Sequence, residues 1–186
     1  DLGGVKVGPK TSRMQITPEW RGSPPPEGNF DIVGAAGCDV APVDLTDEAQ
    51  ALRLKAYIWP EFTARFARMD AAIEAAKTFP PEIVRMRAAD FLAERLKRPQ
   101  EEGTTRVLMH SVVWQYIPQL ERDRIVELIE AAGDRACEDT PLAWVSLEAN
   151  RDTHRHELTV SYWPDGDMRR RLATAHPHGK WIEWRG

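Results

Sequence analysis

The stretch VLMHSVVWQYIPQLERDRIVELIEAAG, Val107 to Gly133, decides the predicted fold of this chain. It begins inside a β-compatible run that predicts a strand over residues 104–112. From Pro118 it predicts a helix, because apolar residues recur at helical spacing and Gly133 is a typical end residue. The predicted inward positions of this helix are Leu120, Ile125, Leu128 and Ile129. A further predicted strand, PLAWVSLEA, follows at residues 141–149, so strand, helix and strand alternate.

The same alternation continues in both directions along the chain. Upstream, predicted strands at residues 30–37 and 82–87 alternate with predicted helices at 47–59, 60–79 and 89–97. Downstream, HELTVSYW and RRRLATAH surround a Pro-Asp-Gly-Asp turn at residues 164–167, which predicts a β-hairpin, and WIEW adds a short strand. Strands that alternate with helices form a parallel sheet with helices on both faces. The predicted fold is therefore α/β, a Rossmann-like, mostly parallel sheet with a C-terminal antiparallel hairpin.

The N-terminal region differs in composition from the rest of the chain. Residues 1–29 are rich in glycine and proline and predict a surface-wrapping segment with a short edge strand at RMQIT. The DLGG motif resembles a phosphate-binding turn, but no strand precedes it and no helix follows, so it is predicted to be a loop. Residues 30–186 are predicted to form one α/β domain, which suits the chain length.

The overall composition is typical of a soluble globular protein and argues against several classes of function. Apolar residues make up 42% of the chain and charged residues 29%. The net charge of −4, without a basic stripe, argues against nucleic-acid binding. No apolar run approaches the roughly 20 residues that cross a bilayer, so no membrane partner is predicted. Cys38 and Cys137 form no CxxC pair, which indicates free thiols in the cytoplasm, although a single disulfide stays open as an alternative.

Candidate site residues follow the predicted strands, because ligands of an open parallel sheet bind beyond the carboxyl ends of its strands. Asp39 follows the first strand and can accept both hydrogen bonds of a ribose diol; a helix-capping aspartate is the alternative. Asp90 follows the second strand and can accept a bond from the exocyclic amine of a base; the N-cap of the next helix is the alternative. Glu148 follows the fourth strand and either faces the same crevice or pairs with Arg151 at the surface.

The third strand ends in the densest group of polar and aromatic residues. We interpret it as a binding wall in which aromatic rings stack on a ligand and His110 or Tyr116 donates or accepts a proton. Its other members are Ser111, Trp114 and Gln115. The alternative is that His110 is a satisfied core residue and Trp114 packs under a helix. A serine hydrolase is not favoured, since neighbours on a strand point to opposite faces and no GxSxG motif is present.

The remaining histidines form two HxH pairs, His154 with His156 and His176 with His178. Alternate residues of a strand share a face, so such pairs can in principle bind zinc. The second pair contains a proline and no cysteine lies near either one, so no metal is predicted.

Several long motifs resemble one bacterial family, the domain of unknown function 2332. They are DLGGVKVG, PEWRG, GCDVAPVDLTD, LKAYIWPEFTARFARMDAA, MHSVVWQYIP and AHPHGKW, and together they extend over nearly the whole chain. Members of that family look like class I S-adenosylmethionine-dependent methyltransferases, and this chain looks like the C-terminal portion. The resemblance implies that the first strand, with its glycine turn, lies upstream of Asp1. The chain is then either a remnant with a gap in the middle of its sheet, or its sheet closes by a rearranged strand order or with a second copy. A sheet with such exposed edges tends to dimerise, so a homodimer is expected.

By analogy with methyltransferases, the resemblance implies roles for the site residues. Asp39 and Asp90 are expected to bind the cofactor, S-adenosylmethionine, through its ribose and adenine. His110 and Tyr116 are expected to be catalytic. The expected substrate contacts are Ser111, Trp114, Gln115 and Glu148. HSVVWQY departs from the Asn/Asp-Pro-Pro-aromatic pattern of amino-methylating enzymes, which argues against amine methylation.

Two functional hypotheses follow from these expectations. The first is methyl transfer from S-adenosylmethionine to an unknown small acceptor, with weak or no cofactor binding by a chain that lacks the glycine turn. The second is a non-catalytic binding or interaction module that keeps the fold without the chemistry. The first predicts a small-molecule ligand, and the second predicts recognition of a ligand or a partner.

Overall fold

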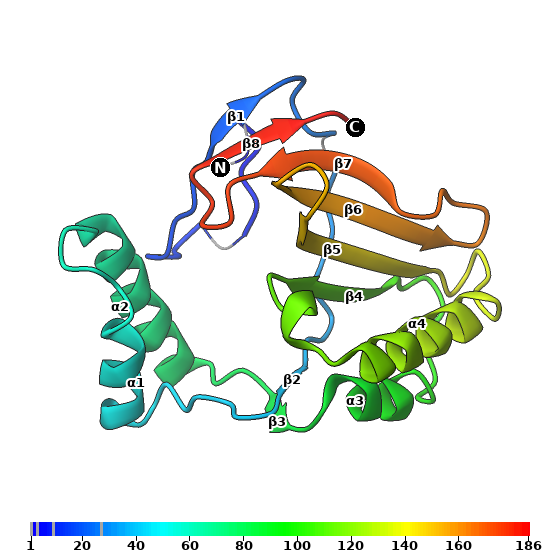
Figure 1. Cartoon of the computed structure of the whole chain (residues 1–186), viewed down its shortest axis with the longest axis horizontal. Helices are drawn as coiled ribbons and strands as arrows, with labels where there is room; N and C mark the ends of the chain where they lie inside the picture. Colours follow the sequence, from blue (N-terminus) through cyan, green and yellow to red (C-terminus); the bar gives the residue numbers. More distant parts are fainter. Residues whose placement is uncertain (1, 3, 9, 27) are drawn as a thin grey trace. The chain divides into compact units, whose positions relative to one another are not determined.

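The structure, a computed structural model, describes residues 2, 4–8, 10–26 and 28–186. The chain divides into two compact units, whose elements are labelled in Figure 1. Unit 1 comprises residues 1–6, 17–27 and 88–186, and unit 2 comprises residues 7–16 and 28–87. The predicted division of the chain after residue 29 stays a prediction.

Unit 2 contains two helices and a small pair of strands. The helices are α1 (Glu48–Lys55) and α2 (Thr63–Thr78), and the strands β2 (Gly37–Asp39) and β3 (Ile83–Arg85) pair in parallel. Helix α1 begins after Asp47, whose carboxylate accepts a hydrogen bond from the backbone N–H of Gln50 at 2.9 Å. The predicted strand at residues 30–37 is wrong except at Gly37, where β2 begins, and the side chains of Phe30, Ile32 and Val33 are exposed.

Unit 1 contains a mixed six-stranded sheet with the strand order β1-β8-β7-β6-β5-β4. Its strands are β1 (Glu19–Arg21), β4 (Arg106–Ser111), β5 (Leu142–Asn150), β6 (Arg155–Trp163), β7 (Arg170–Ala175) and β8 (Trp181–Trp184). The pairs β4–β5 and β1–β8 are parallel, whereas β5–β6, β6–β7 and β7–β8 are antiparallel. The strands are contiguous from β1 to β4, so the predicted central gap does not occur.

The prediction of a Rossmann-like, mostly parallel sheet is wrong. Strands β5 and β6 are each nine residues long, and only a turn at residues 151–154 joins them. Such a connection permits only an antiparallel pair, because a parallel pair needs a crossover of roughly a dozen or more residues. The sheet therefore grows from β5 as a meander through β6, β7 and β8, while β2 and β3 pair with each other in unit 2.

Helices α3 (Ala88–Arg95) and α4 (Gln119–Gly133) pack together, and α4 packs on β5. They share one core cluster formed by Ala89, Leu96, Ile125, Ile129 and Leu142. Both helices of unit 1 thus belong to the same face of its sheet, and the predicted cover on both faces is not found within this unit. The predicted inward position Leu120 is also wrong, since its side chain is 84% exposed.

The two faces of the six-stranded sheet differ in chemistry, because successive side chains of a strand alternate between them. One face, here called the polar face, carries Ser146, Glu148, Glu157, Thr159, Ser161, Thr174 and Glu183. Its helix-covered end carries Leu142, Trp144 and Trp163. The other, the apolar face, carries Val145, Leu147, Leu158, Val160, Ala173, Ala175 and Ile182.

Within the residues that the structure describes, every helix is too short or too polar to cross a bilayer.

Candidate functional site

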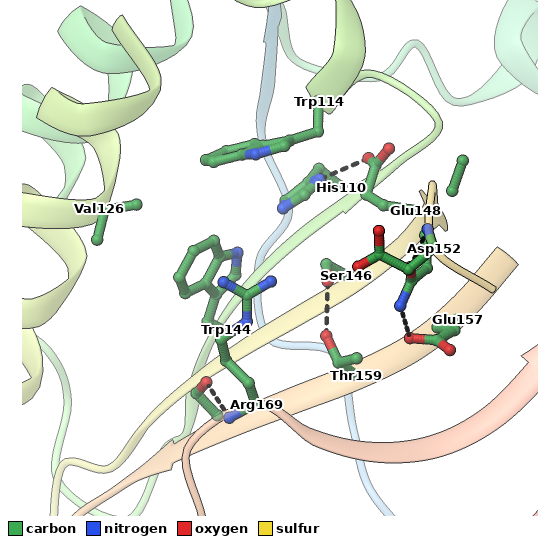
Figure 2. A pocket seen from close by; sticks show the side chains of 13 residues that line it. His110, Trp114, Val126, Trp144, Ser146, Glu148, Asp152, Glu157, Thr159 and Arg169 are labelled. Atoms are coloured by element: carbon green, nitrogen blue, oxygen red, sulfur yellow. Dashed lines mark hydrogen bonds and ion pairs between the residues drawn. The ribbon is translucent and has the colours of Figure 1, made fainter. Parts of the chain in front are cut away.

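A pocket of about 340 Å³ opens on the polar face of the sheet, within unit 1 (Figure 2). Its walls come from β4, β5, β6, α4, the 3₁₀ helix η1 (Trp114–Tyr116) and the turns at either end of β6. Ligand sites in proteins typically measure about 300–1,000 Å³, so this pocket suits a small molecule.

The pair His110 and Glu148 forms the polar centre of the pocket. Strands β4 and β5 run in parallel with His110 opposite Ser146, so Glu148 is the next residue along β5 on the same face. The distance from His110 Nδ1 to Glu148 Oε1 is 2.8 Å, and the same oxygen accepts the backbone N–H of Val113 at 3.1 Å. The two side chains are only 20% and 15% exposed. The bond therefore holds the imidazole in one orientation.

The charge of Glu148 follows from two opposing effects. Burial by itself raises the pKa of Glu148, because it removes water from the carboxylate. Hydrogen bonds from His110 and from the backbone N–H groups of Val113 and Trp114 more than offset burial, so the pKa lies below its ordinary value of 4.5. Glu148 is ionised at neutral pH and only accepts hydrogen bonds. The network therefore assigns the ring proton of His110 to Nδ1.

The second ring nitrogen of His110, Nε2, is buried and has no hydrogen-bond partner among the described residues. The ring stacks on Trp114, with centroids 5.1 Å apart, and lies 6.0 Å from the ring of Trp144 (Figure 2). The indole Nε1 of Trp144 is also buried, and no described residue accepts its hydrogen bond. A buried polar atom without a partner costs about 1–3 kcal/mol. Both atoms belong to residues that line the pocket, so two unsatisfied polar groups lie at its wall.

Arg169 contributes a positive charge from the turn between β6 and β7. Its backbone N–H donates to Ser161 Oγ at 2.8 Å, and Ser161 is only 2% exposed. Its φ of 54° lies in the left-handed region, so the bond to Ser161 stabilises an uncommon conformation. In the described part of the chain, no carboxylate or other acceptor pairs with its guanidinium.

Two further carboxylates line the pocket and differ in their bonding. Glu157 accepts hydrogen bonds from Asn150 at 2.9 Å, Arg171 at 2.9 Å and Thr153 at 3.2 Å. Burial raises the pKa of Glu157, but these bonds bring it below its ordinary value. The carboxylate of Asp152 makes no hydrogen bond or ion pair with a described residue, although its backbone N–H donates to Asn150 Oδ1 at 2.9 Å. The carboxylate of Glu157 is therefore already occupied by donors of the protein, and the carboxylate of Asp152 can accept a hydrogen bond from a ligand.

Three of the residues predicted from the sequence meet at this pocket, namely His110, Trp114 and Glu148. Glu148 bonds to His110 and Val113, not to Arg151 as in the surface alternative. Tyr116 is 75% exposed and does not line the pocket. Ser111 and Gln115 do not line it either, because Ser111 points to the opposite side of β4 from His110. The catalytic and substrate-binding roles assigned to all of these residues stay predictions.

The two predicted cofactor residues lie elsewhere in the chain. Asp90 is in the first turn of α3 and forms an exposed ion pair with Arg124 at 2.8 Å. It is not the N-cap, because the helix begins at Ala88. Asp39 ends β2 in unit 2, where its carboxylate accepts the backbone N–H of Ala41 at 2.7 Å. Their roles in binding S-adenosylmethionine also stay predictions.

Sequence reasoning missed the residues that come from the meander, above all Asp152, Thr159, Ser161 and Arg169. The signal was present: residues 142–150 and 155–163 are two alternating runs separated by four residues, which predicts a hairpin and brings their polar positions to one face. Among the described residues, no three His, Cys, Asp or Glu side chains gather so as to hold a metal ion.

Comparison with known proteins identifies the family of the chain but no activity. No curated protein and no solved structure matches it. Nothing in these comparisons supports a resemblance to S-adenosylmethionine-dependent methyltransferases. Residues 1–184 match the family described as "Uncharacterized protein conserved in bacteria (DUF2332)". Because the match extends over nearly the whole chain, the family resemblance is confirmed, and the chain belongs to this bacterial family.

Proposed function

We propose that the protein is an enzyme acting on a small molecule in this pocket, with His110 as a general base oriented by Glu148. One observation carries the proposal: an ionised Glu148 binds Nδ1 of His110, while Nε2 is buried at the pocket without a partner. With its proton on Nδ1, the neutral ring has its lone pair on Nε2. A carboxylate that holds a histidine in this tautomer also stabilises the imidazolium formed when Nε2 accepts a proton.

The arrangement favours a substrate proton or a water proton as the target of this base. An enzyme nucleophile would be hydrogen-bonded to Nε2, yet no described hydroxyl or thiol is. The hydroxyl of Ser146, which is opposite His110 in the sheet, is bonded to that of Thr159 at 2.8 Å. The reaction class that suits these groups is proton abstraction from a bound substrate, or attack by a water that His110 activates.

Substitution of His110 by asparagine tests the proposal. The amide nitrogen of Asn occupies a place close to that of Nδ1, so the variant keeps a donor for Glu148 and loses the base. We expect at least one metabolite of a bacterial extract to be consumed by the wild-type protein, as followed by mass spectrometry. Its consumption should fall by about 100-fold or more in His110→Asn, the usual contribution of a general base.

The matched control is His154→Asn, a histidine outside the pocket in a left-handed turn conformation that asparagine tolerates. This variant should consume the metabolite at the wild-type rate. Equal consumption by the wild type and His110→Asn would contradict the proposal. Ligand binding without any consumption would instead support the non-catalytic binding module.

Methyl transfer from S-adenosylmethionine stays a second hypothesis, because a general base is what transfer to a hydroxyl acceptor requires. Asp39 and Asp90 are the residues predicted to bind its cofactor, and the ion pair of Asp90 with Arg124 would have to open for Asp90 to take part. Calorimetric titration with S-adenosylhomocysteine tests it. Micromolar affinity that Asp39→Ala abolishes would support methyl transfer, and binding that Asp39→Ala leaves unchanged would refute the cofactor role of Asp39.

A further inference from the structure

We infer that the substrate of the pocket is a small zwitterion, whose anionic group binds at Arg169 and Trp144 and whose cationic group binds at Asp152. The inference deepens the proposed function. Only the statement that the ligand is a substrate rests on that function. Its test measures binding rather than turnover.

The anionic end is indicated by two donors without acceptors. The guanidinium of Arg169 has no hydrogen-bond or ion-pair partner among the described residues. Nε1 of Trp144 is a buried donor that likewise has no acceptor among them. They belong to one side of the pocket, because Arg169 bonds through its backbone to Ser161, which is opposite Trp144 in the sheet. A carboxylate accepts two hydrogen bonds and pairs well with a guanidinium. It would therefore satisfy both donors.

The cationic end is indicated by the free carboxylate of Asp152. Asp152 belongs to the turn between β5 and β6, whereas Arg169 belongs to the turn at the other end of β6. Figure 2 shows the two side chains on opposite sides of His110 and Ser146. A ligand with separated charges can therefore contact both, with its reactive part near Nε2 of His110.

The charge of the pocket excludes a simpler anionic ligand. Glu157 and Glu148 are occupied by donors of the protein, which leaves one free cation and one free carboxylate among the charged groups that line the pocket. A phosphate monoester would bring about two negative charges to a site with a single guanidinium and three carboxylates. A zwitterion adds no net charge and gives each of the two free charged groups an opposite partner. The indoles of Trp114 and Trp144 add apolar wall for an uncharged part of the ligand.

The first test is a thermal-shift panel on the whole chain. The probes are the proteinogenic L-amino acids, β-alanine, γ-aminobutyrate and glycylglycine, which differ in the separation of their charges. At a concentration of about 100 times Kd, a ligand should raise the melting temperature by several degrees. We expect at least one probe to do so. If none of them does, the inference is overturned.

The second test removes one charge of the best probe at a time. Its N-acetyl derivative lacks the cation and its carboxamide lacks the anion, and calorimetry should show each binding at least about tenfold more weakly than the free compound. An N-acetyl derivative or carboxamide that binds as tightly as the free compound would overturn the inference.

Matched variants assign each charge to its end. Arg169→Gln should weaken the zwitterion about tenfold or more and leave the carboxamide unaffected, whereas Asp152→Asn should weaken the zwitterion and leave the N-acetyl derivative unaffected. Arg170→Gln and Asp165→Asn make the same charge changes at residues that do not line the pocket, so they should bind like the wild type. Equal effects of Arg169→Gln and Arg170→Gln would contradict the assignment.

The two proposals fail in different ways. If zwitterions bind as described but His110→Asn still consumes the metabolite, the general base is refuted and the ligand class stands. If His110→Asn loses consumption but no zwitterion binds, the base stands and the ligand class is refuted.

Discussion

The two faces of the six-stranded sheet use the same strands for different purposes. The apolar face is built mainly from Val, Leu, Ile and Ala, together with Trp184 and His156, and its Ala173 is completely buried at 0% exposure. The polar face carries hydroxyls and carboxylates at the alternate positions of the same strands, and Thr174, the neighbour of Ala173, is 1% exposed. Side chains are therefore buried to a similar extent on the two faces, but those of one face are mostly apolar and those of the other are mostly polar.

The stability of the fold explains the composition of the apolar face but not that of the whole polar face. Burial of apolar side chains stabilises the fold and accounts for the apolar face. Burial of polar groups opposes folding unless each finds a partner. Most groups of the polar face have one, as Ser146 has Thr159 and Glu157 has Asn150, but Nε2 of His110 does not. Substitutions on the apolar face should therefore cost stability, and substitutions in the pocket should cost function.

The largest effect is expected from a charge on the apolar face. Ala173→Asp places a carboxylate where no water reaches, and we expect a loss of about 3–5 kcal/mol in the free energy of unfolding. Chemical denaturation followed by circular dichroism measures it. Ala149→Asp is the control, because Ala149 lies on the same face but is exposed, and its effect should stay within about 0.5 kcal/mol. Equal losses for the two variants would refute the assignment of Ala173 to a core.

The next effect tests the helix-covered end of the polar face. A Cβ on Gly133 would clash with Cε2 and Nε1 of Trp163, so Gly133→Ala forces the indole or α4 to shift. Alanine favours helices, yet we expect a net loss of about 1–3 kcal/mol from this overpacking. A urea titration measures the loss. Adding Trp163→Phe should recover part of it, and a stabilising Gly133→Ala would show that α4 does not pack here.

A smaller, pH-dependent effect is expected from Glu148→Gln. The pKa of Glu148 is lowered by folding, so its carboxylate stabilises the fold above the unfolded value of 4.5, and this contribution disappears as the pH falls through the folded pKa. We expect Glu148→Gln to lose about 1–2 kcal/mol at neutral pH and little in acid.

The free energies of unfolding of wild type and variant, compared from neutral pH downwards, check this dependence. Glu127→Gln on the exposed side of α4 should show a difference that does not change with pH. A constant difference for Glu148→Gln as well would mean that its hydrogen bonds do not depend on charge.

The smallest effect on stability is expected at Arg169. Its guanidinium has no partner among the described residues and its side chain is exposed, so Arg169→Gln should change the free energy of unfolding by less than about 0.5 kcal/mol. The same variant should lose ligand affinity. A stability loss comparable to that of Gly133→Ala would assign Arg169 to the fold and not to the pocket.

The sequence predicts the elements of this protein better than their arrangement. The strands at β4 to β8 and helices α1 to α4 lie near their predicted positions, because hydrophobic periodicity is a local signal. The predicted parallel sheet is wrong because β5 pairs with β6 across the short turn at residues 151–154, and the alternation of strands and helices upstream does not decide that pairing.

The residues of the site also fall into a group that the sequence predicts and a group that depends on how the strands are arranged. His110, Trp114 and Glu148 were predictable, since β4 and β5 are joined by the predicted crossover through α4 and their ends lie together. Asp152 and Arg169 were not, because both lie in turns that reach the pocket only when β6 folds back on β5.

The central claim is that Glu148 holds His110 with its proton on Nδ1 and leaves Nε2 free for a substrate. Long-range ¹H–¹⁵N spectra of the imidazole at about pH 8, assigned with the His110→Asn variant, test it most directly. We expect the Nδ1–H tautomer in the wild type. A proton on Nε2 would contradict the claim, since the base would then face away from the pocket.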